Sequence, residues 1–196
     1  MAYYSYQSIR PVVDPSAFVH EAAILIGEVV IGARCFIGAG AVLRGDFGSI
    51  FVGEGSNIQE TCVVHSFPNR SVEIGKNAHI GHGAVLHGCI LEDNCLIGMN
   101  AVVMDGARIG ANSIVGALSF VKEGCEIAQN KLAFGNPVRE IRTLSAEERA
   151  WKVQGTQIYQ QIAKAKEIKP CTPLLPEDEQ NIQRSEFSHH RPLNEQ

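Results

Sequence analysis

An aliphatic residue returns at every sixth position along most of this 196-residue chain. The array begins at Val19 and ends at Val121, with short insertions before Val52, before Ile74 and around Cys89. A six-residue period of this kind is typical of a β-helix, in which short strands alternate with turns. The expected coils are centred on residues 31–37–43, 52–58–64, 74–80–86, 91–97–103 and 109–115–121.

The third residue after the aliphatic position is Gly or Asn in most units, and these residues adopt positive φ most readily. The positions are Gly40, Gly55, Asn77, Gly83, Asn94, Asn100, Gly106 and Asn112. Each unit is therefore expected to be a short strand that ends in a sharp turn. Three units complete a triangular coil, and successive coils stack at about 4.8 Å. The pattern predicts an all-β parallel β-helix, shaped as a triangular prism.

Small residues recur four positions after the aliphatic residue, and four cysteines occupy this slot: Cys35, Cys62, Cys95 and Cys125. They are expected to be buried free thiols, because cysteine commonly behaves as a small apolar residue. Cys89 and Cys171 lie outside the slot and are expected to be more exposed.

The six-residue period ends after Val121, and a different pattern follows. Residues 145–148 read Ser-Ala-Glu-Glu, a capping box that predicts the start of a helix. Its expected apolar stripe consists of Trp151, Ile158, Ile162 and Ala165. We expect a β-helix with an N-terminal lead-in over residues 1–143, a helix packed along its outside within 144–169, and a flexible tail over 170–196.

The composition gives no indication of a nucleic-acid or membrane partner. The net charge is −4 without a basic block, and the longest apolar runs span only a few residues. The first residues lack the pattern of a signal peptide. We therefore expect a cytoplasmic protein.

Two histidines are expected to lie one above the other. His65 and His87 each follow the third aliphatic residue of adjacent coils, and both side chains point outward. Their backbones should be one strand spacing apart, so both imidazoles can bind one metal ion at about 2.0–2.1 Å. His82 lies on the preceding edge and should not reach that point on its own chain. It can complete the site of a neighbour, which predicts a homotrimer with a metal at each interface.

Three neutral nitrogens with an open fourth position are typical of catalytic zinc. Fe²⁺ and Co²⁺ also accept imidazole ligands. Such an ion lowers the pKa of its bound water to about 7, and the resulting hydroxide can attack CO2 or an activated acyl carbonyl.

These histidines belong to a set of motifs that resembles the γ-class carbonic anhydrase family over roughly residues 10–165. The motifs are Arg44-Gly-Asp46, residues 56–60, Val64-His65, residues 79–88 and residues 97–101. The resemblance implies left-handed winding and a trimer in which two histidines of one subunit and one of the next hold the metal. It also implies that Arg44 and Asp46 lie at the interface beside the metal, and that Gln59 orients the metal-bound water.

One residue and one loop depart from the family pattern. Glu60 stands where the family usually has Asp, which keeps the charge but lengthens the reach. Residues 66–70 contain no acid, whereas the archetype has a proton-shuttling glutamate in the corresponding loop. On the helix, Tyr159 is expected to be a polar contributor to the site, and His79 is expected either at the surface or in support of the ligands.

Residues 144–148, 150–152 and 154–156 extend the match to a subgroup of accessory proteins from phenylacetate and carnitine metabolism. That similarity implies an alternative activity, hydrolysis of aromatic coenzyme A thioesters. Two other hypotheses remain. A hexapeptide-repeat acyltransferase would use one histidine as a general base without a metal, and a structural trimer would use the metal only for assembly.

Overall fold

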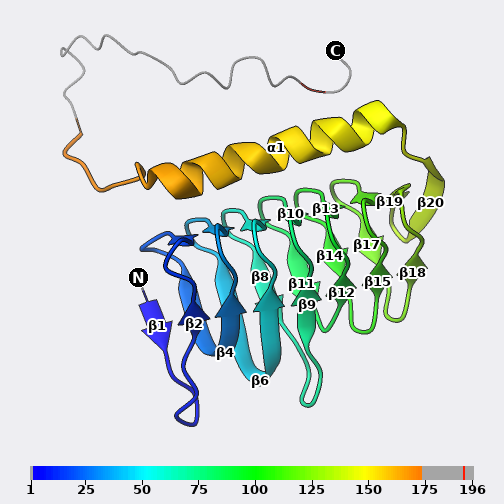
Figure 1. Ribbon diagram of the computed structural model, residues 1–196. Helices are drawn as coiled ribbons and strands as arrows, with labels where there is room; N and C mark the ends of the chain where they lie inside the picture. The colour runs from blue at the N-terminus through cyan, green and yellow to red at the C-terminus, as the bar shows by residue number, and fades with distance from the viewer. Residues whose placement is uncertain (1, 174–191, 193–196) are drawn as a thin grey trace, which may run out of the picture.

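The computed structural model describes residues 2–173 and residue 192. It is a left-handed parallel β-helix of about 7 turns with a single C-terminal helix, α1 (Ala146–Ala165), which confirms the predicted fold class (Figure 1). Most of the predicted tail, 170–196, lies outside the described residues. None of the helical structure within the described part is long and apolar enough to cross a bilayer.

The strands form the three faces of a prism. Two long strands, β4 (Ile24–Ile31) and β6 (Val42–Val52), run around one edge and join two faces into a 12-stranded sheet. The first of these faces, here called the histidine face, continues through β8 (Val63–His65), β11 (Val85–His87), β14 (Val102–Val103) and β17 (Phe120–Val121). The second face continues through β9 (Val72–Ile74), β12 (Ile90–Leu91), β15 (Arg108–Ile109) and β18 (Glu126–Ile127). Two further strands, β1 (Ala2–Tyr4) and β2 (Val12–Val13), pair with β4.

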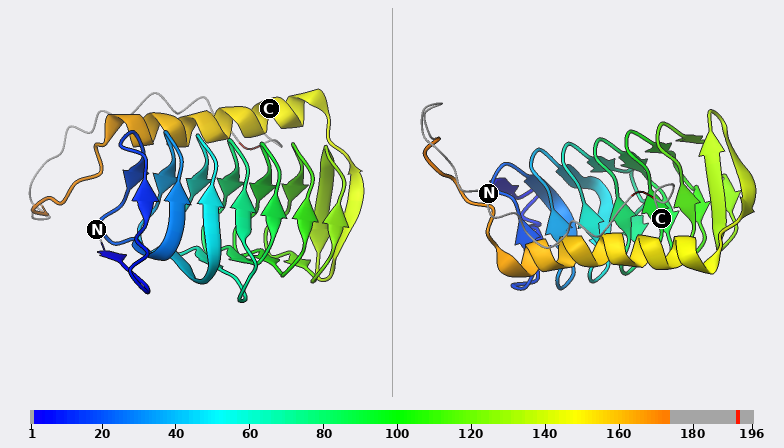
Figure 2. Two further views of the ribbon diagram at one scale, coloured as in Figure 1. Left: turned by 60° about the horizontal axis from the view of Figure 1, so that its bottom comes forward. Right: turned by 90° about the horizontal axis from the view of Figure 1, so that it is seen from above.

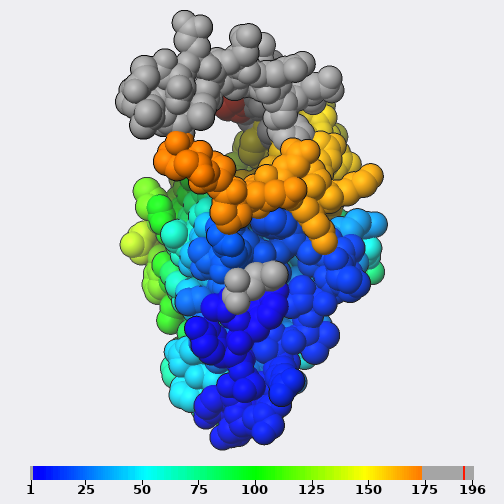
Figure 3. All heavy atoms as spheres, turned by 90° about the vertical axis from the view of Figure 1, so that its left-hand side faces the viewer, coloured from blue at the N-terminus to red at the C-terminus, as the bar shows by residue number. Residues whose placement is uncertain are grey.

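The third face, here called the helix face, is an 8-stranded sheet. Its strands are β3 (Phe18–Val19), β5 (Phe36–Ile37), β7 (Asn57–Ile58), β10 (His79–Ile80), β13 (Leu96–Ile97), β16 (Ile114–Val115), β19 (Lys131–Gly135) and β20 (Val138–Thr143). Helix α1 runs back along the prism from the last coils to the first (Figure 2). When the prism is viewed from its N-terminal end, the first coils face the viewer and the C-terminal end of α1 lies above them (Figure 3).

The predicted turns and register are confirmed. All eight Gly and Asn residues at the turn position have φ between 53° and 72°. Val64 pairs with Leu86, and His65 with His87, in parallel register. The aliphatic residues point inward, and members such as Leu43, Val64 and Leu86 are fully buried.

The cysteine predictions are confirmed at Cys35, Cys62, Cys95 and Cys171, but not at Cys89 or fully at Cys125. Cys35, Cys62 and Cys95 are buried and Cys171 is exposed, whereas Cys125 is only partly buried. Cys89 is also fully buried, so the expectation of exposure was wrong. The physical reason is its spacing from the following aliphatic residue. Cys89 lies two positions before Leu91, where alternation along the strand points a side chain inward.

The repeat continues further than the sequence analysis predicted. Ile127 in β18 pairs with Ile109, and Ala133 in β19 pairs with Val115, so the six-residue step persists beyond Val121. Both residues are buried. The β-helix then ends in an antiparallel pair of β19 with β20. Ile127 keeps the six-residue step after Val121 and could have been recognised in the sequence. Ala133 is too small to mark an aliphatic position.

The capping box at the start of α1 is confirmed. Ser145 Oγ accepts a hydrogen bond from the Glu148 N–H at 3.2 Å, and Glu148 Oε2 accepts one from the Ser145 N–H at 2.8 Å.

The predicted packing face of α1 was wrong. The buried helix residues are Lys152, Thr156 and Ala163, whereas the predicted stripe stays partly or fully exposed. The prism edge beneath α1 presents polar asparagines, so the helix packs with polar groups that hydrogen-bond to them. Lys152 Nζ donates to the Asn77 carbonyl and, at 2.7 Å, to Asn94 Oδ1.

Candidate metal centre

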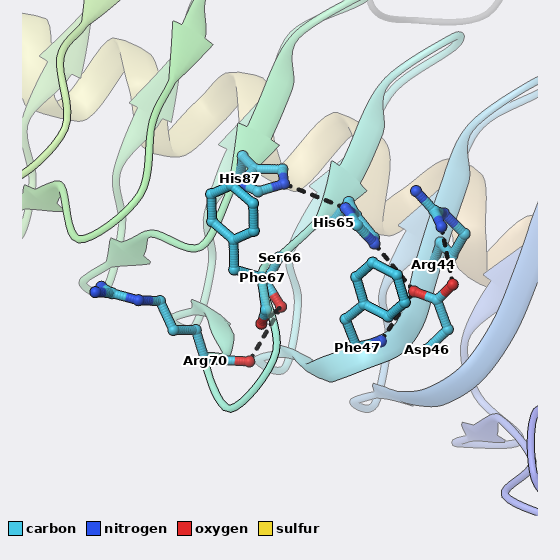
Figure 4. A network of polar contacts seen from close by, with 8 residues as sticks. All are labelled: Arg44, Asp46, Phe47, His65, Ser66, Phe67, Arg70 and His87. Carbon is cyan, nitrogen blue, oxygen red and sulfur yellow. Dashed lines mark hydrogen bonds and ion pairs between the residues drawn. The ribbon is translucent and has the colours of Figure 1, made fainter.

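The parallel pairing of β8 with β11 places His65 and His87 side by side on the histidine face. His65 Nδ1 and His87 Nε2 face each other at 3.2 Å, and the ring centroids are 5.2 Å apart (Figure 4). The two predicted ligands of one chain are therefore brought together as expected from their positions in adjacent coils.

A carboxylate lies on the opposite side of each ring. Asp46 Oδ1 is 3.0 Å from His65 Nε2, and both Asp105 oxygens lie within 2.9 Å of His87 Nδ1. These contacts orient the rings so that Nδ1 of His65 and Nε2 of His87 are the two nitrogens that face each other. Carboxylates commonly hold metal-binding histidines in this way.

Arg44 lies in the column predicted for it, because Leu43 pairs with Val64. Its Nη1 donates to Asp46 Oδ2 at 2.8 Å. Burial is the largest single influence on Asp46 and opposes its ionisation. The hydrogen bonds from His65 and Arg44 together outweigh burial and hold the pKa of this carboxyl below its ordinary value. Asp46 is therefore ionised at neutral pH.

Asp105 is a site residue that the sequence analysis missed. Only 3% of its surface is exposed, and it follows Val103 by two residues at a corner of the prism. Gly88 makes room for it, because a Cβ at Gly88 would overlap Asp105 Oδ1. The available signal was its place one coil after His87. Strands β11 and β14 pair with an offset of 17 residues, so Asp105 lies one residue beyond the position that is one coil on from His87.

Two exposed aromatic rings flank the histidine pair. Phe47 lies 5.4 Å from His65, and Phe67 lies 5.0 Å from His87, measured between ring centroids (Figure 4). The exposed fractions of Phe47 and Phe67 are 49% and 57%. The arrangement gives the polar centre an apolar rim.

His82 belongs to a second cluster, at the edge between the helix face and the histidine face. Its Nδ1 lies 2.6 Å from Glu60 Oε2, which leaves Nε2 available to a ligand. About half of the His82 side chain is exposed. Within the described residues, no three His, Cys, Asp or Glu side chains converge as a possible metal site. One chain thus supplies the His65–His87 pair and, on a different edge, a single carboxylate-bound histidine.

Gln59 and Tyr159 lie with this second cluster. Gln59 is 3% exposed, and its amide nitrogen contacts Asn57 and His79. Burial, followed by the charge of Glu60, raises the pKa of Tyr159 to about 12. The Tyr159 hydroxyl therefore remains a hydrogen-bond donor at all physiological pH values. The predicted site residues thus fall into two groups, Arg44, Asp46, His65 and His87 in one and Gln59, Glu60, His82 and Tyr159 in the other.

The six-residue repeat matches known family models, and most of the chain aligns with known proteins. Residues 88–123 match the family described as bacterial transferase hexapeptide (six repeats), and residues 28–66 match the hexapeptide repeat of succinyl-transferase. The carnitine operon protein CaiE of Escherichia coli K12 is 48% identical over 162 residues, which cover 83% of each chain. CaiE of Salmonella agona is 45% identical over 163 residues, covering 83% of this chain and 82% of that protein.

Two solved structures are also similar. A candidate acetyltransferase from Bacillus cereus is 32% identical with a TM-score of 0.82, over 84% of this chain and 96% of that one. A hexapeptide transferase family protein from Anaplasma phagocytophilum is 35% identical with a TM-score of 0.81, over 84% and 97%.

The fold and these matches define a left-handed β-helix protein of the hexapeptide-repeat class. Within that class, the chain belongs to the γ-carbonic-anhydrase-like family that includes the carnitine operon protein CaiE.

Proposed function

We propose that this protein is a trimeric metal-dependent enzyme of the γ-carbonic-anhydrase type, which catalyses the reversible hydration of CO2 to bicarbonate. The observation that carries the proposal is the 3.2 Å separation of two histidine nitrogens, each on a ring whose other nitrogen contacts a carboxylate.

The donor set fits a divalent ion. Asp46 and Asp105 accept the N–H groups of His65 Nε2 and His87 Nδ1, so both facing nitrogens carry lone pairs. Two facing lone pairs are unfavourable without a cation between them. Two imidazoles bound at about 2.0–2.1 Å in tetrahedral geometry would have nitrogens about 3.4 Å apart, close to the observed separation. Zn²⁺ fits these ligands, and Fe²⁺ or Co²⁺ accept the same donors.

A second copy of the chain is the source of the third ligand, His82. Hexapeptide-repeat β-helix proteins are typically trimers, and a three-fold ring would bring the His82 edge of one subunit to the histidine face of the next. Both surfaces expose apolar side chains. Phe47 and Phe67 lie on the histidine face, and Met99 and Leu118 follow His82 in the next two coils of its edge.

The exposed position of Leu118 is consistent with an interface. Its side chain is 73% exposed and its φ is 59°, a left-handed conformation that residues other than Gly, Asn and Asp rarely adopt. The neighbouring coil has Asn100 at the equivalent turn position. An exposed leucine at this turn position supports a contact surface rather than a turn optimised for stability.

The bound ion would supply a nucleophile at neutral pH by lowering the pKa of water to about 7. The protein would orient both histidine rings through Asp46 and Asp105. The carbonyl oxygen of Gln59 and the hydroxyl of Tyr159 can accept and donate hydrogen bonds at the shared site. Arg44 can bind a product carboxylate through the N–H groups that it does not use on Asp46.

Hydrolysis of aromatic coenzyme A thioesters is the alternative that uses the same site. The rings of Phe47 and Phe67 beside the histidines offer an apolar surface for an acyl group. Residues 66–70 contain no carboxylate to remove the proton that CO2 hydration releases. Acyl transfer is a third candidate, supported by the descriptions of the two similar solved structures.

The deciding experiment combines metal analysis with three assays on the purified protein. The purified protein should contain one metal ion per subunit. It should catalyse CO2 hydration or phenylacetyl-CoA hydrolysis, and the His82→Ala variant should lack that activity. His20→Ala serves as a control because His20 follows β3, the last strand at the N-terminal end of the helix face and three strands away from β10. Acyl transfer by a metal-free protein, or full hydratase and hydrolase activity in His82→Ala, would contradict the proposal.

A further inference from the structure

A chain of hydrogen bonds connects α1 to Gln59. Gln59 Nε2 is 3.0 Å from Asn57 Oδ1 and 2.7 Å from His79 Nε2. Both amide hydrogens are therefore used. No donor among the described residues contacts the Gln59 carbonyl oxygen, although the side chain is only 3% exposed. This oxygen is thus a buried acceptor without a donor among the described residues.

The orientation of the Gln59 amide depends on the tautomer of His79. For Gln59 Nε2 to donate to His79 Nε2, that ring nitrogen must carry a lone pair, and the ring proton must be on Nδ1. With the proton on Nε2 instead, the ring would donate, and the amide would turn to present its oxygen to His79. The free acceptor would then be lost.

Thr156 selects the tautomer that keeps the acceptor free. Thr156 Oγ1 donates to the Lys152 carbonyl one helical turn earlier, at 3.2 Å. Its lone pairs are left for His79 Nδ1, which lies 3.4 Å away. Asn57 Nδ2 lies 3.3 Å from the same nitrogen as a competing donor. Without the hydroxyl, the Asn57 amide would donate to Nδ1 and move the ring proton to Nε2.

The helix is fixed on both sides of Thr156. Lys152 and Gln160 lie four residues before and after it, on the same helix face. Lys152 Nζ donates to Asn94 Oδ1 at 2.7 Å, and Gln160 Nε2 donates to the Gly55 carbonyl at 2.9 Å. Tyr159 packs edge-on against His79 at 5.3 Å between centroids and restricts its rotation. The hydroxyl of Thr156 is therefore held in place against His79.

We propose that Thr156 is a positioning residue, which fixes the tautomer of His79 and thereby directs the carbonyl oxygen of Gln59 to the shared site. The assignment of the His79 tautomer is argued from the hydrogen bonds alone, whereas its effect on catalysis through Gln59 rests on the proposed function. Helix α1 is thus part of the site through a residue 77 positions away from His79.

A matched pair of variants tests the proposal. Thr156→Val keeps the shape of the side chain and removes the acceptor, whereas Thr156→Ser keeps the hydroxyl. The ¹⁵N chemical shifts of the His79 ring, recorded by NMR on the metal-free trimer, report which nitrogen carries the proton. We expect Nδ1–H in the wild type and in Thr156→Ser, and Nε2–H in Thr156→Val. A wild-type His79 protonated on Nε2, or an unchanged tautomer in Thr156→Val, would overturn the proposal without reference to any activity.

Kinetics then test the route through Gln59. Thr156→Val should lower kcat about tenfold with little change in KM, but should have no further effect in a Gln59→Ala background. An equal loss in both backgrounds would show that Thr156 does not act through Gln59. If the wild type has the expected tautomer but no hydratase or hydrolase activity, the proposed function fails and the hydrogen-bond assignment stands.

Discussion

His87 and Asp105 lie in successive coils, and the His87 Nδ1 atom is within 2.9 Å of both oxygens of the Asp105 carboxylate. Because the carboxylate is almost fully buried, its access to solvent is small and His87 is its main charged or polar side-chain contact among the described residues. It therefore fixes the direction in which His87 presents Nε2.

Asp105→Asn should weaken metal binding about 10–100-fold, the usual effect of removing a carboxylate behind a histidine ligand. Competition against a chelator of known affinity measures this change. Asp93→Asn, at another turn of the prism, is the control and should bind the metal as tightly as the wild type. Equal affinity of Asp105→Asn and the wild type would show that this carboxylate does not orient a ligand.

Leu118→Asn should have opposite effects on the fold and on the assembly. Asparagine tolerates the observed φ of 59° better than leucine, so the turn should gain about 1 kcal/mol. The proposed trimer should dissociate more readily, because the variant would lose an apolar contact at the proposed interface. Sedimentation across a dilution series measures dissociation, and urea unfolding at fixed concentration measures stability. A trimer that dissociates at the same concentration as the wild type would remove Leu118 from the interface.

Lys152 should make stability depend on pH. Burial lowers the pKa of its ammonium to about 7 in the folded protein, against about 10.4 when unfolded. Between these values the unfolded chain binds more protons, so the contribution of Lys152 to the free energy of unfolding should rise with pH. The difference in stability between the wild type and Lys152→Met should therefore shift in favour of the wild type from pH 7.5 to pH 9.5. Parallel pH profiles of the two proteins would contradict this account.

The coils and the histidine pair could be predicted because both depend on regular spacing. A fixed period places Val64 beside Leu86, and His65 beside His87, without any knowledge of distant contacts. Arg44 was placed in the same way, since its neighbour Leu43 belongs to the same stack.

The remaining features depend on contacts that the period does not describe. The packing face of α1 could not be read from its apolar residues, because the prism edge beneath it carries polar groups such as Asn94. Thr156 acquires its role only through His79, which is 77 residues away. Asp105 was missed because a buried acid at a corner looks like an ordinary turn residue until its partner is known.

Two subunits are proposed to share one metal site, and mixed trimers test this arrangement most directly. His65→Ala and His82→Ala damage opposite sides of the interface, so each variant alone should lack both metal and activity. When equal amounts are unfolded and refolded together, about a quarter of the interfaces should combine two intact sides and recover metal and activity in that proportion. A mixture that stays as inactive and metal-free as its components, or either variant active alone, would contradict a shared site.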